Sequence, residues 1–126
     1  MVIDVDVALD TWARWSKRVL AGLGYPAINI IARIVRYGIL GAARQLGTRV
    51  TEVDDLAELV ERAVLTRLDE QEQEIVRRHY CLPEPDYISA DQMGIDPRRF
   101  SEKLADAKRS VEDYLSGAVE SRINVA

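Results

Sequence analysis

The stretch that decides the fold is residues 88–111, which read ISADQMGIDPRRFSEKLADAKRSV. Ser89 can cap a helix of barely one turn at residues 90–93, and Gly94 ends that helix. A long second helix then begins at residue 97 and is expected to run to about residue 116. The sequence therefore predicts a helix, a tight turn and a second helix.

Two small residues and a cap give this stretch the pattern of a helix-turn-helix. Ala90 lets the first helix pack closely across the second, and Gly94, four residues later, can take the backbone conformation that opens the turn. Asp96 can cap the second helix, where Pro97 is favoured at the first position. An apolar stripe is expected to press the second helix onto the core; its residues are Ile95, Phe100, Leu104, Ala107 and Val111.

The other face of the second helix begins with polar, mostly basic side chains. In a DNA-binding helix-turn-helix such positions enter the major groove, where arginine can bond guanine bidentately and glutamate can accept from cytosine. Residues 96–109 carry five basic and three acidic side chains in a chain of net charge −4. Two helices joined by a glycine turn also occur in domains that never bind DNA, so a packing role is the alternative. The predicted DNA-contacting residues are Arg98, Arg99, Ser101, Glu102 and Lys103, with Arg77 and Arg78 of the preceding helix flanking the same groove.

Charge is distributed unevenly along the 126 residues. Residues 1–50 carry seven basic and three acidic side chains, residues 51–75 two and nine, and residues 76–126 eight and nine. A chain of this kind can contact a phosphate backbone with one face and a basic protein surface with another. Ordinary solvated helix surface is the alternative explanation of the pattern.

The rest of the chain shows helical patterns and no strand pattern, so we expect an all-α fold. Asp69 with Glu72, and Thr51 with Asp54, look like helix caps. Residues 38–51, which hold three glycines, are expected to form a loop or a frayed helix, and residues 81–87, which hold two prolines, a loop. The predicted helices are residues 6–21, 27–37, 53–68, 70–80, 90–93 and 97–116.

The expected organisation has three parts. Residues 1–50 form an N-terminal helical segment and loop, which is a possible RNA polymerase- or RNA-contacting part. Residues 51–116 form a helical DNA-binding domain, and residues 117–126 a loosely ordered tail, since chain ends are often poorly held. Trp12 and Trp15 are expected to pack against neighbouring helices, because large aromatic side chains are mostly buried.

The chain has one cysteine, Cys81, and one histidine, His79. An internal disulfide and a four-ligand zinc site of the cysteine–histidine kind are therefore excluded within one chain. A nucleophile–base pair also needs an orienting third group, and the sequence suggests none, so we expect neither an enzyme nor a cofactor. We expect no metal site, because Asp4, Asp6 and Asp10 lie where a helix dipole favours carboxylates.

No apolar run approaches the ~18 residues of a membrane span. The first ten residues, MVIDVDVALD, lack the basic start and apolar stretch of a signal peptide. We expect a cytoplasmic protein without a membrane partner.

Two segments carry a resemblance to known families. Residues 68–80, LDEQEQEIVRRHY, and 87–115, YISADQMGIDPRRFSEKLADAKRSVEDYL, resemble region four of bacterial sigma factors, including the alanine-basic pair Ala107 and Lys108. With residues 9–26, LDTWARWSKRVLAGLGYP, the arrangement over about residues 9–115 resembles the Q-type late-gene antitermination factors of lambdoid phages, in the branch that lacks a zinc finger. The loop at 81–87 is longer than in a typical sigma region four, and residues 38–51 match neither pattern.

The resemblance implies a protein that binds a specific DNA element beside a phage late promoter and loads onto paused RNA polymerase while sigma is still present. In that family the factor narrows the RNA exit channel and so suppresses pausing and termination. Two other functions stay open: a conventional helix-turn-helix activator or repressor acting at initiation, and a helical adaptor that binds sigma or polymerase and no DNA. The candidate contacts to nascent RNA or polymerase are Arg33, Arg36, Arg44 and Arg49.

Overall fold

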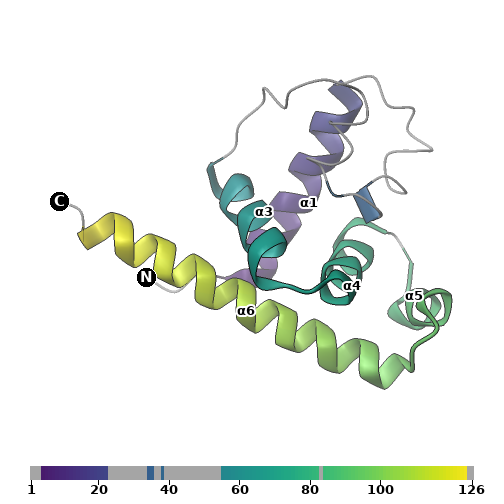
Figure 1. Cartoon of the computed structure of the whole chain (residues 1–126). Helices are drawn as coiled ribbons and strands as arrows, with labels where there is room; N and C mark the ends of the chain where they lie inside the picture. Colours follow the sequence, from purple (N-terminus) through teal and green to yellow (C-terminus); the bar gives the residue numbers. More distant parts are fainter. Residues whose placement is uncertain (1–3, 23–33, 36–37, 39–54, 83, 125–126) are drawn as a thin grey trace.

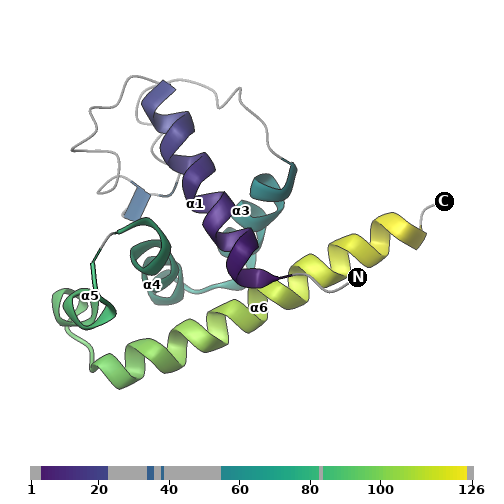
Figure 2. The same ribbon diagram turned by 180° about the vertical axis from the view of Figure 1, so that it is seen from behind.

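The computed structural model describes residues 4–22, 34–35, 38, 55–82 and 84–124. Every regular element within these ranges is a helix, which confirms the all-α expectation. The long helix α6 runs along one side of the other helices, and its C-terminal end extends past α1 and α3 (Figures 1 and 2). The helices are α1 (Val5–Gly22), α3 (Asp55–Arg67), α4 (Glu70–Cys81), α5 (Asp86–Met93) and α6 (Pro97–Asn124).

The first helix, α1, starts at an aspartate cap. Oδ1 of Asp4 accepts hydrogen bonds from the backbone N–H groups of Asp6 and Val7, at 3.0 and 3.3 Å, which satisfies donors that lack partners within the helix. The buried face of α1 then follows helical spacing and packs against α3, α4 and α6. Its buried residues are Ala8, Leu9, Trp12, Ala13, Trp15, Ser16, Val19 and Leu20.

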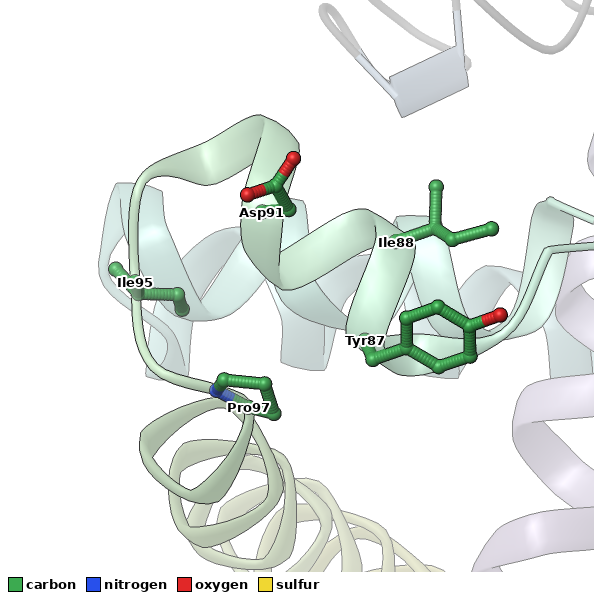
Figure 3. A pocket seen from close by; sticks show the side chains of 5 residues that line it. All are labelled: Tyr87, Ile88, Asp91, Ile95 and Pro97. Atoms are coloured by element: carbon green, nitrogen blue, oxygen red, sulfur yellow. The ribbon is translucent and has the colours of Figure 1, made fainter.

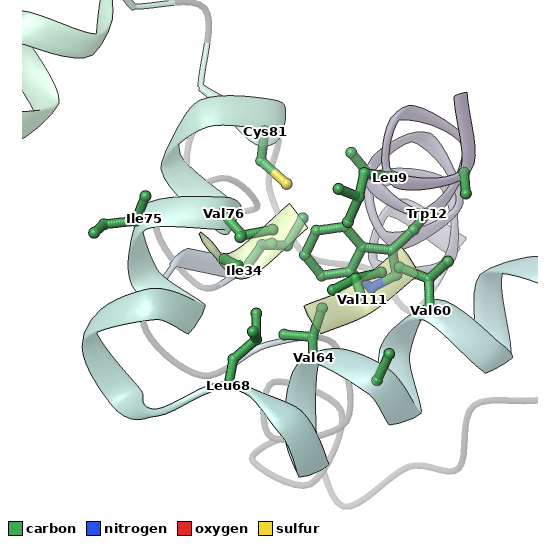
Figure 4. Packing of buried hydrophobic residues seen from close by; sticks show 14 of the residues in the cluster. Leu9, Trp12, Ile34, Val60, Val64, Leu68, Ile75, Val76, Cys81 and Val111 are labelled. Carbon is green, nitrogen blue, oxygen red and sulfur yellow. The ribbon is translucent and has the colours of Figure 1, made fainter. Parts of the chain in front are cut away.

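Trp12 lies at the centre of the core. Its indole is fully buried among aliphatic side chains from α3, α4 and α6 and the buried Ile34 (Figure 4). Trp15 is also buried, so the expectation that both tryptophans pack inward is confirmed. Because α1 and Ile34 share this core with residues 55–115, the described part of residues 1–50 packs as one body with the rest.

The predicted cap between α3 and α4 is present in full. Asp69 Oδ1 accepts from the Glu72 backbone N–H at 2.7 Å, and Glu72 Oε1 accepts from the Asp69 backbone N–H at 3.2 Å, which together make a capping box. The thiol of Cys81, at the end of α4, is buried, and burial raises its pKa to about 12. It therefore stays protonated and behaves as a small apolar side chain.

Two predicted helix boundaries are wrong. α5 is an eight-residue helix that begins at Asp86, after Pro85 in an extended conformation, and Ser89 is buried within it instead of capping it. The loop predicted at 81–87 is correspondingly shorter. α6 continues through Gly117 to Asn124, so the residues predicted as a loosely ordered tail are helical as far as position 124. An exposed helix tolerates a glycine at a cost of only about 1 kcal/mol.

Some expectations fall where the structure gives no description. Ile34 and Val35 are helical, in agreement with the helix predicted at 27–37. The cap proposed at Thr51 and Asp54, and nearly all of the loop predicted at 38–51, lie outside the described residues.

Candidate nucleic-acid interface

The turn between α5 and α6 is held by backbone geometry. Gly94 has φ +71° in the left-handed region, and its N–H donates to the carbonyl of Asp91 at 3.0 Å. The N–H of Ile95 donates to the carbonyl of Ala90, also at 3.0 Å, which closes the end of α5. Side chains other than glycine avoid this conformation, so the predicted role of the glycine is confirmed.

The start of α6 is capped as predicted. Asp96 Oδ1 accepts from the backbone N–H of Arg98 at 2.8 Å, and the Asp96 carbonyl accepts from the N–H of Phe100 at 2.9 Å. Pro97 follows the cap at the first helical position, where its missing N–H leaves no donor unsatisfied. The direction in which α6 leaves the turn is therefore fixed within its first residues.

The two faces of α6 differ as expected. Phe100, Ala107 and Val111 are fully buried, Leu104 is nearly so, and Ala90 of α5 is buried where the two helices meet. The opposite side of the first two turns carries the predicted DNA-contacting side chains. Arg98, Arg99, Ser101 and Glu102 are exposed, and Lys103 is half-buried.

The exposed basic groups at this end of α6 are only loosely held. The side chain of Arg98 is 89% exposed, and its Nε lies 3.6 Å from Glu102 Oε1, a separation typical of a weak surface pair. Arg99 and Lys103 have no ion pair with any residue that the structure describes. Long cationic side chains of this kind can turn toward a phosphate or a base edge without breaking a strong internal contact.

The structure corrects the prediction for Arg77, which is 5% exposed and lies in the interior instead of flanking a groove. Its Nη2 donates to Gln73 Oε1 at 3.1 Å, and its guanidinium packs against Gly38, where a Cβ would lie 2.7 Å from Nη2. Burial lowers the pKa of Arg77, and the nearby Glu61 partly offsets this effect. Arg77 is therefore no longer a candidate DNA contact.

Glu61 is a buried acid that the sequence analysis missed. It is 3% exposed on α3 and accepts a short hydrogen bond from Trp12 Nε1. Desolvation raises its pKa, although the Trp12 hydrogen bond and the charge of Arg77 act in the opposite direction. The signal was its position, because Glu61 falls at helical spacing on the same stripe as Val60 and Val64.

Arg78 is also held by contacts within the protein and is largely buried. Its side chain is 15% exposed, its Nη1 donates to Gln92 Oε1 of α5 at 2.7 Å, and its Nε and Nη2 both donate to Glu74 Oε1 at 3.2 Å. These contacts join α4 to the C-terminal end of α5. Arg78, which was predicted to flank the DNA groove, is instead a residue that positions α5.

The N-terminal end of α5 is held by the neighbouring residue of α4. His79 Nδ1 lies 2.8 Å from Asp86 Oδ1 in the first turn of α5. The ring of His79 also meets Tyr80 edge-on, with centroids 4.7 Å apart. Two consecutive residues of α4 thus contact both ends of α5.

A further polar cluster ties α1 to α4 and α6. Asp6 Oδ1 accepts from the hydroxyl of Tyr80 at 2.6 Å and lies 2.9 Å from Lys108 Nζ. The Tyr80 hydrogen bond and then Lys108 lower the pKa of Asp6, while burial and Asp6 raise the pKa of Tyr80. Lys108, the basic member of the alanine-basic pair, is thereby engaged within the protein.

The remaining predictions concern the arginines expected to contact RNA or polymerase, a metal site and a membrane span. Arg33, Arg36, Arg44 and Arg49 lie outside the described residues. Within the described ranges, no group of three or more histidine, cysteine, aspartate or glutamate side chains is placed to hold a metal ion. No helix in the same ranges has the length and apolar character to cross a membrane.

Comparisons with protein-family models, with curated proteins and with solved structures found no match to this chain. The candidate interface therefore depends on its own geometry: α5, a tight turn, and α6, which exposes basic and polar side chains at its start.

Proposed function

We propose that this protein binds a specific DNA element through the first two turns of α6 and acts as a transcription antitermination factor. The observation that carries the DNA-binding part is the placement of Arg98, Arg99 and Lys103. Arg98 and Arg99 are exposed and Lys103 is half-buried in the first two turns of α6, directly after a capped turn that packs against α5. Figure 1 shows this end of α6 at the edge of the molecule, beside α5 alone.

The expected chemistry is major-groove recognition. A helix about 10–12 Å wide fits the major groove, and arginine at its first turns can donate two hydrogen bonds to guanine. Each good base contact contributes about 1–3 kcal/mol of discrimination against the wrong base. Ser101 and Glu102 lie on the same exposed side and offer a hydroxyl and an acceptor for neighbouring positions.

The antitermination part depends on the resemblance to Q-type factors described above. It agrees with the charge pattern, since the described part of the acidic segment, residues 55–75, comprises α3 and the start of α4, away from the basic end of α6. An acidic face can approach basic elements of a polymerase while α6 occupies DNA. RNA polymerase, with its sigma factor, is the partner that this proposal requires.

DNA binding is tested first with paired arginine variants. Arg99→Ala and Arg98→Ala should weaken binding to the selected site by roughly 5- to 150-fold. Arg62→Ala is the matched control, because Arg62 is likewise exposed and paired with a glutamate one helical turn away, but on α3. The site is first selected from random duplexes with the full chain, and binding is measured by footprinting. Equal affinity of all three variants would refute the assignment of α6 as the recognition helix.

Antitermination is tested separately on a template with a terminator far downstream of the promoter. The wild-type protein should raise readthrough on templates that carry the selected site, and Arg99→Ala should lose the effect. A change in transcript number without any change in readthrough would instead identify a regulator of initiation. Polymerase or sigma binding with no salt-dependent DNA affinity would identify an adaptor, since phosphate contacts make affinity fall steeply with salt.

A further inference from the structure

The outer side of α5 forms a second surface, distinct from the side chains proposed to contact DNA. Tyr87, Ile88, Asp91, Ile95 and Pro97 line a surface hollow of about 310 Å³ (Figure 3). They come from α5, from the turn and from the first residue of α6. The hollow therefore lies next to the DNA-reading turns without including Arg98 or Arg99.

Apolar side chains of α5 lie both on its inner side and at the hollow, while its remaining residues are polar. Ala90 is buried on the inner side and Met93 packs partly against the core, while Tyr87 and Ile88 lie on the side of the hollow. Exposed apolar side chains that gather at one place, with polar residues around them, are typical of an interaction site. Among the described residues, Tyr87 is the most exposed large hydrophobic side chain, at 63%.

The chemistry of the hollow indicates what covers it. Tyrosine is enriched at the centres of protein interfaces, because its ring buries a large apolar area while its hydroxyl stays near water. Asp91 is exposed at the same hollow and makes no ion pair with any described residue. A carboxylate at this position repels phosphate and attracts a cation, so it disfavours nucleic acid and favours a basic peptide.

We propose that this hollow docks a protein segment that presents an aliphatic or aromatic side chain next to a lysine or arginine. The apolar side chain packs against Tyr87, Ile88 and Ile95, and the basic group pairs with Asp91. A protein bound here would lie beside the DNA that α6 contacts. The docking itself does not require DNA binding, so the two proposals can fail independently.

The test uses a displayed library of short linear peptides, selected on the full chain in the absence of DNA. Enriched peptides should combine an apolar residue with a neighbouring basic residue. Tyr87→Ser should weaken their binding by about tenfold or more, as expected at the centre of an interface. Asp91→Lys should favour acidic residues in place of the basic one. The matched control is Leu65→Ser, which removes an exposed apolar side chain from α3, outside the hollow.

Every other outcome counts against the proposal. No enrichment, or peptides that bind Tyr87→Ser as tightly as the wild type, would overturn it. Self-association measured by sedimentation equilibrium and abolished by Tyr87→Ser would assign the hollow to a second copy of the chain. Loss of DNA affinity in Tyr87→Ser without an effect on peptides would assign it to the DNA interface. Thermal unfolding of each variant checks that the fold is unchanged.

Discussion

Arg78 Nη1 lies 2.7 Å from Gln92 Oε1, and this contact joins the end of α4 to the end of α5. The same guanidinium is fixed on its own helix by Glu74, and the adjacent His79 meets Asp86 at the start of α5. α5 has only eight residues, which is too short for an isolated helix to be stable in water. Two consecutive side chains of α4 therefore set the position of the helix that supports the turn.

Replacing Arg78 by methionine should loosen α5 without removing a DNA contact. Hydrogen bonds to a charged group contribute about 1.5–3 kcal/mol each, and the exposed Gln92 recovers part of this from water, so we expect a loss of about 1–2 kcal/mol in unfolding free energy. DNA affinity should fall while its dependence on salt stays the same. Urea unfolding and binding at two salt concentrations measure both effects. A salt slope reduced by about 1 would instead make Arg78 a phosphate contact.

The Arg77–Arg78 pair shows where sequence reasoning reached its limit. The apolar residues of α4 indicate which side of the helix is buried, but they do not show that a long basic side chain beside them is buried as well. Arg77 hydrogen-bonds Gln73 of its own helix, and the charge of Glu61 on α3 partly offsets the effect of burial on the pKa of Arg77. Glu61 itself was detectable, because it interrupts an apolar stripe at a helical position. The approach of α3 to α4 depends on tertiary packing, which no local pattern specifies.

The turn was predictable because its requirements are local. A left-handed residue at position 94, a cap at Asp96 and a proline after it are each encoded within a few positions. The two wrong boundaries had weaker signals. The prolines of residues 81–87 indicate a loop, although α5 begins directly after Pro85. Position near the chain end indicates a loosely ordered tail from residue 117, although α6 continues to Asn124.

Asp6 should make stability depend on acidity. Its folded pKa is lowered by Tyr80 and Lys108, so its contribution is complete above the ordinary value of 3.8 and is lost as pH falls through the folded pKa. Asp6→Asn should therefore be less stable than the wild type near neutral pH, with the difference shrinking in acid. The side chain is 63% exposed, so we expect only about 0.2–1 kcal/mol.

Chemical denaturation across this acid range measures the effect. Asp10→Asn is the control, because among the described residues Asp10 pairs with the exposed Arg14 of its own helix and with no residue of another helix. A difference between Asp6→Asn and the wild type that grows as pH falls would contradict the role of Asp6 as an interhelical contact.

Glu61 should make stability depend on pH in the direction opposite to that of Asp6. Desolvation raises its pKa in the folded state, so its stabilising contribution is complete below the unfolded pKa and is lost as pH rises through the folded pKa. Glu61→Gln keeps an acceptor for Trp12 without a titrating group. Its stability relative to the wild type should therefore increase with pH, by at most about 1.4 kcal/mol per unit.

The unfolding of the wild type and of Glu61→Gln is followed by tryptophan fluorescence, since Trp12 lies in the core. Glu58→Gln changes a less buried glutamate of the same helix and serves as the control. If the difference in unfolding free energy between Glu61→Gln and the wild type does not change with pH, Glu61 is not held in the desolvated environment described above.

Gly94 and Gly117 offer a direct comparison of backbone conformations. A Cβ added at either position has no atom within 4 Å, so neither substitution creates a clash. Gly94 has φ +71°, and alanine there should cost about 1–2 kcal/mol and weaken DNA binding through the turn. Gly117 lies within α6, where alanine should stabilise the helix by about 0.5–1 kcal/mol and leave DNA binding unchanged. Thermal unfolding and footprinting of the two variants measure these effects. If Gly94→Ala were as stable as the wild type, the turn would not depend on a left-handed residue, and the start of α6 would lack the fixed direction that base recognition requires.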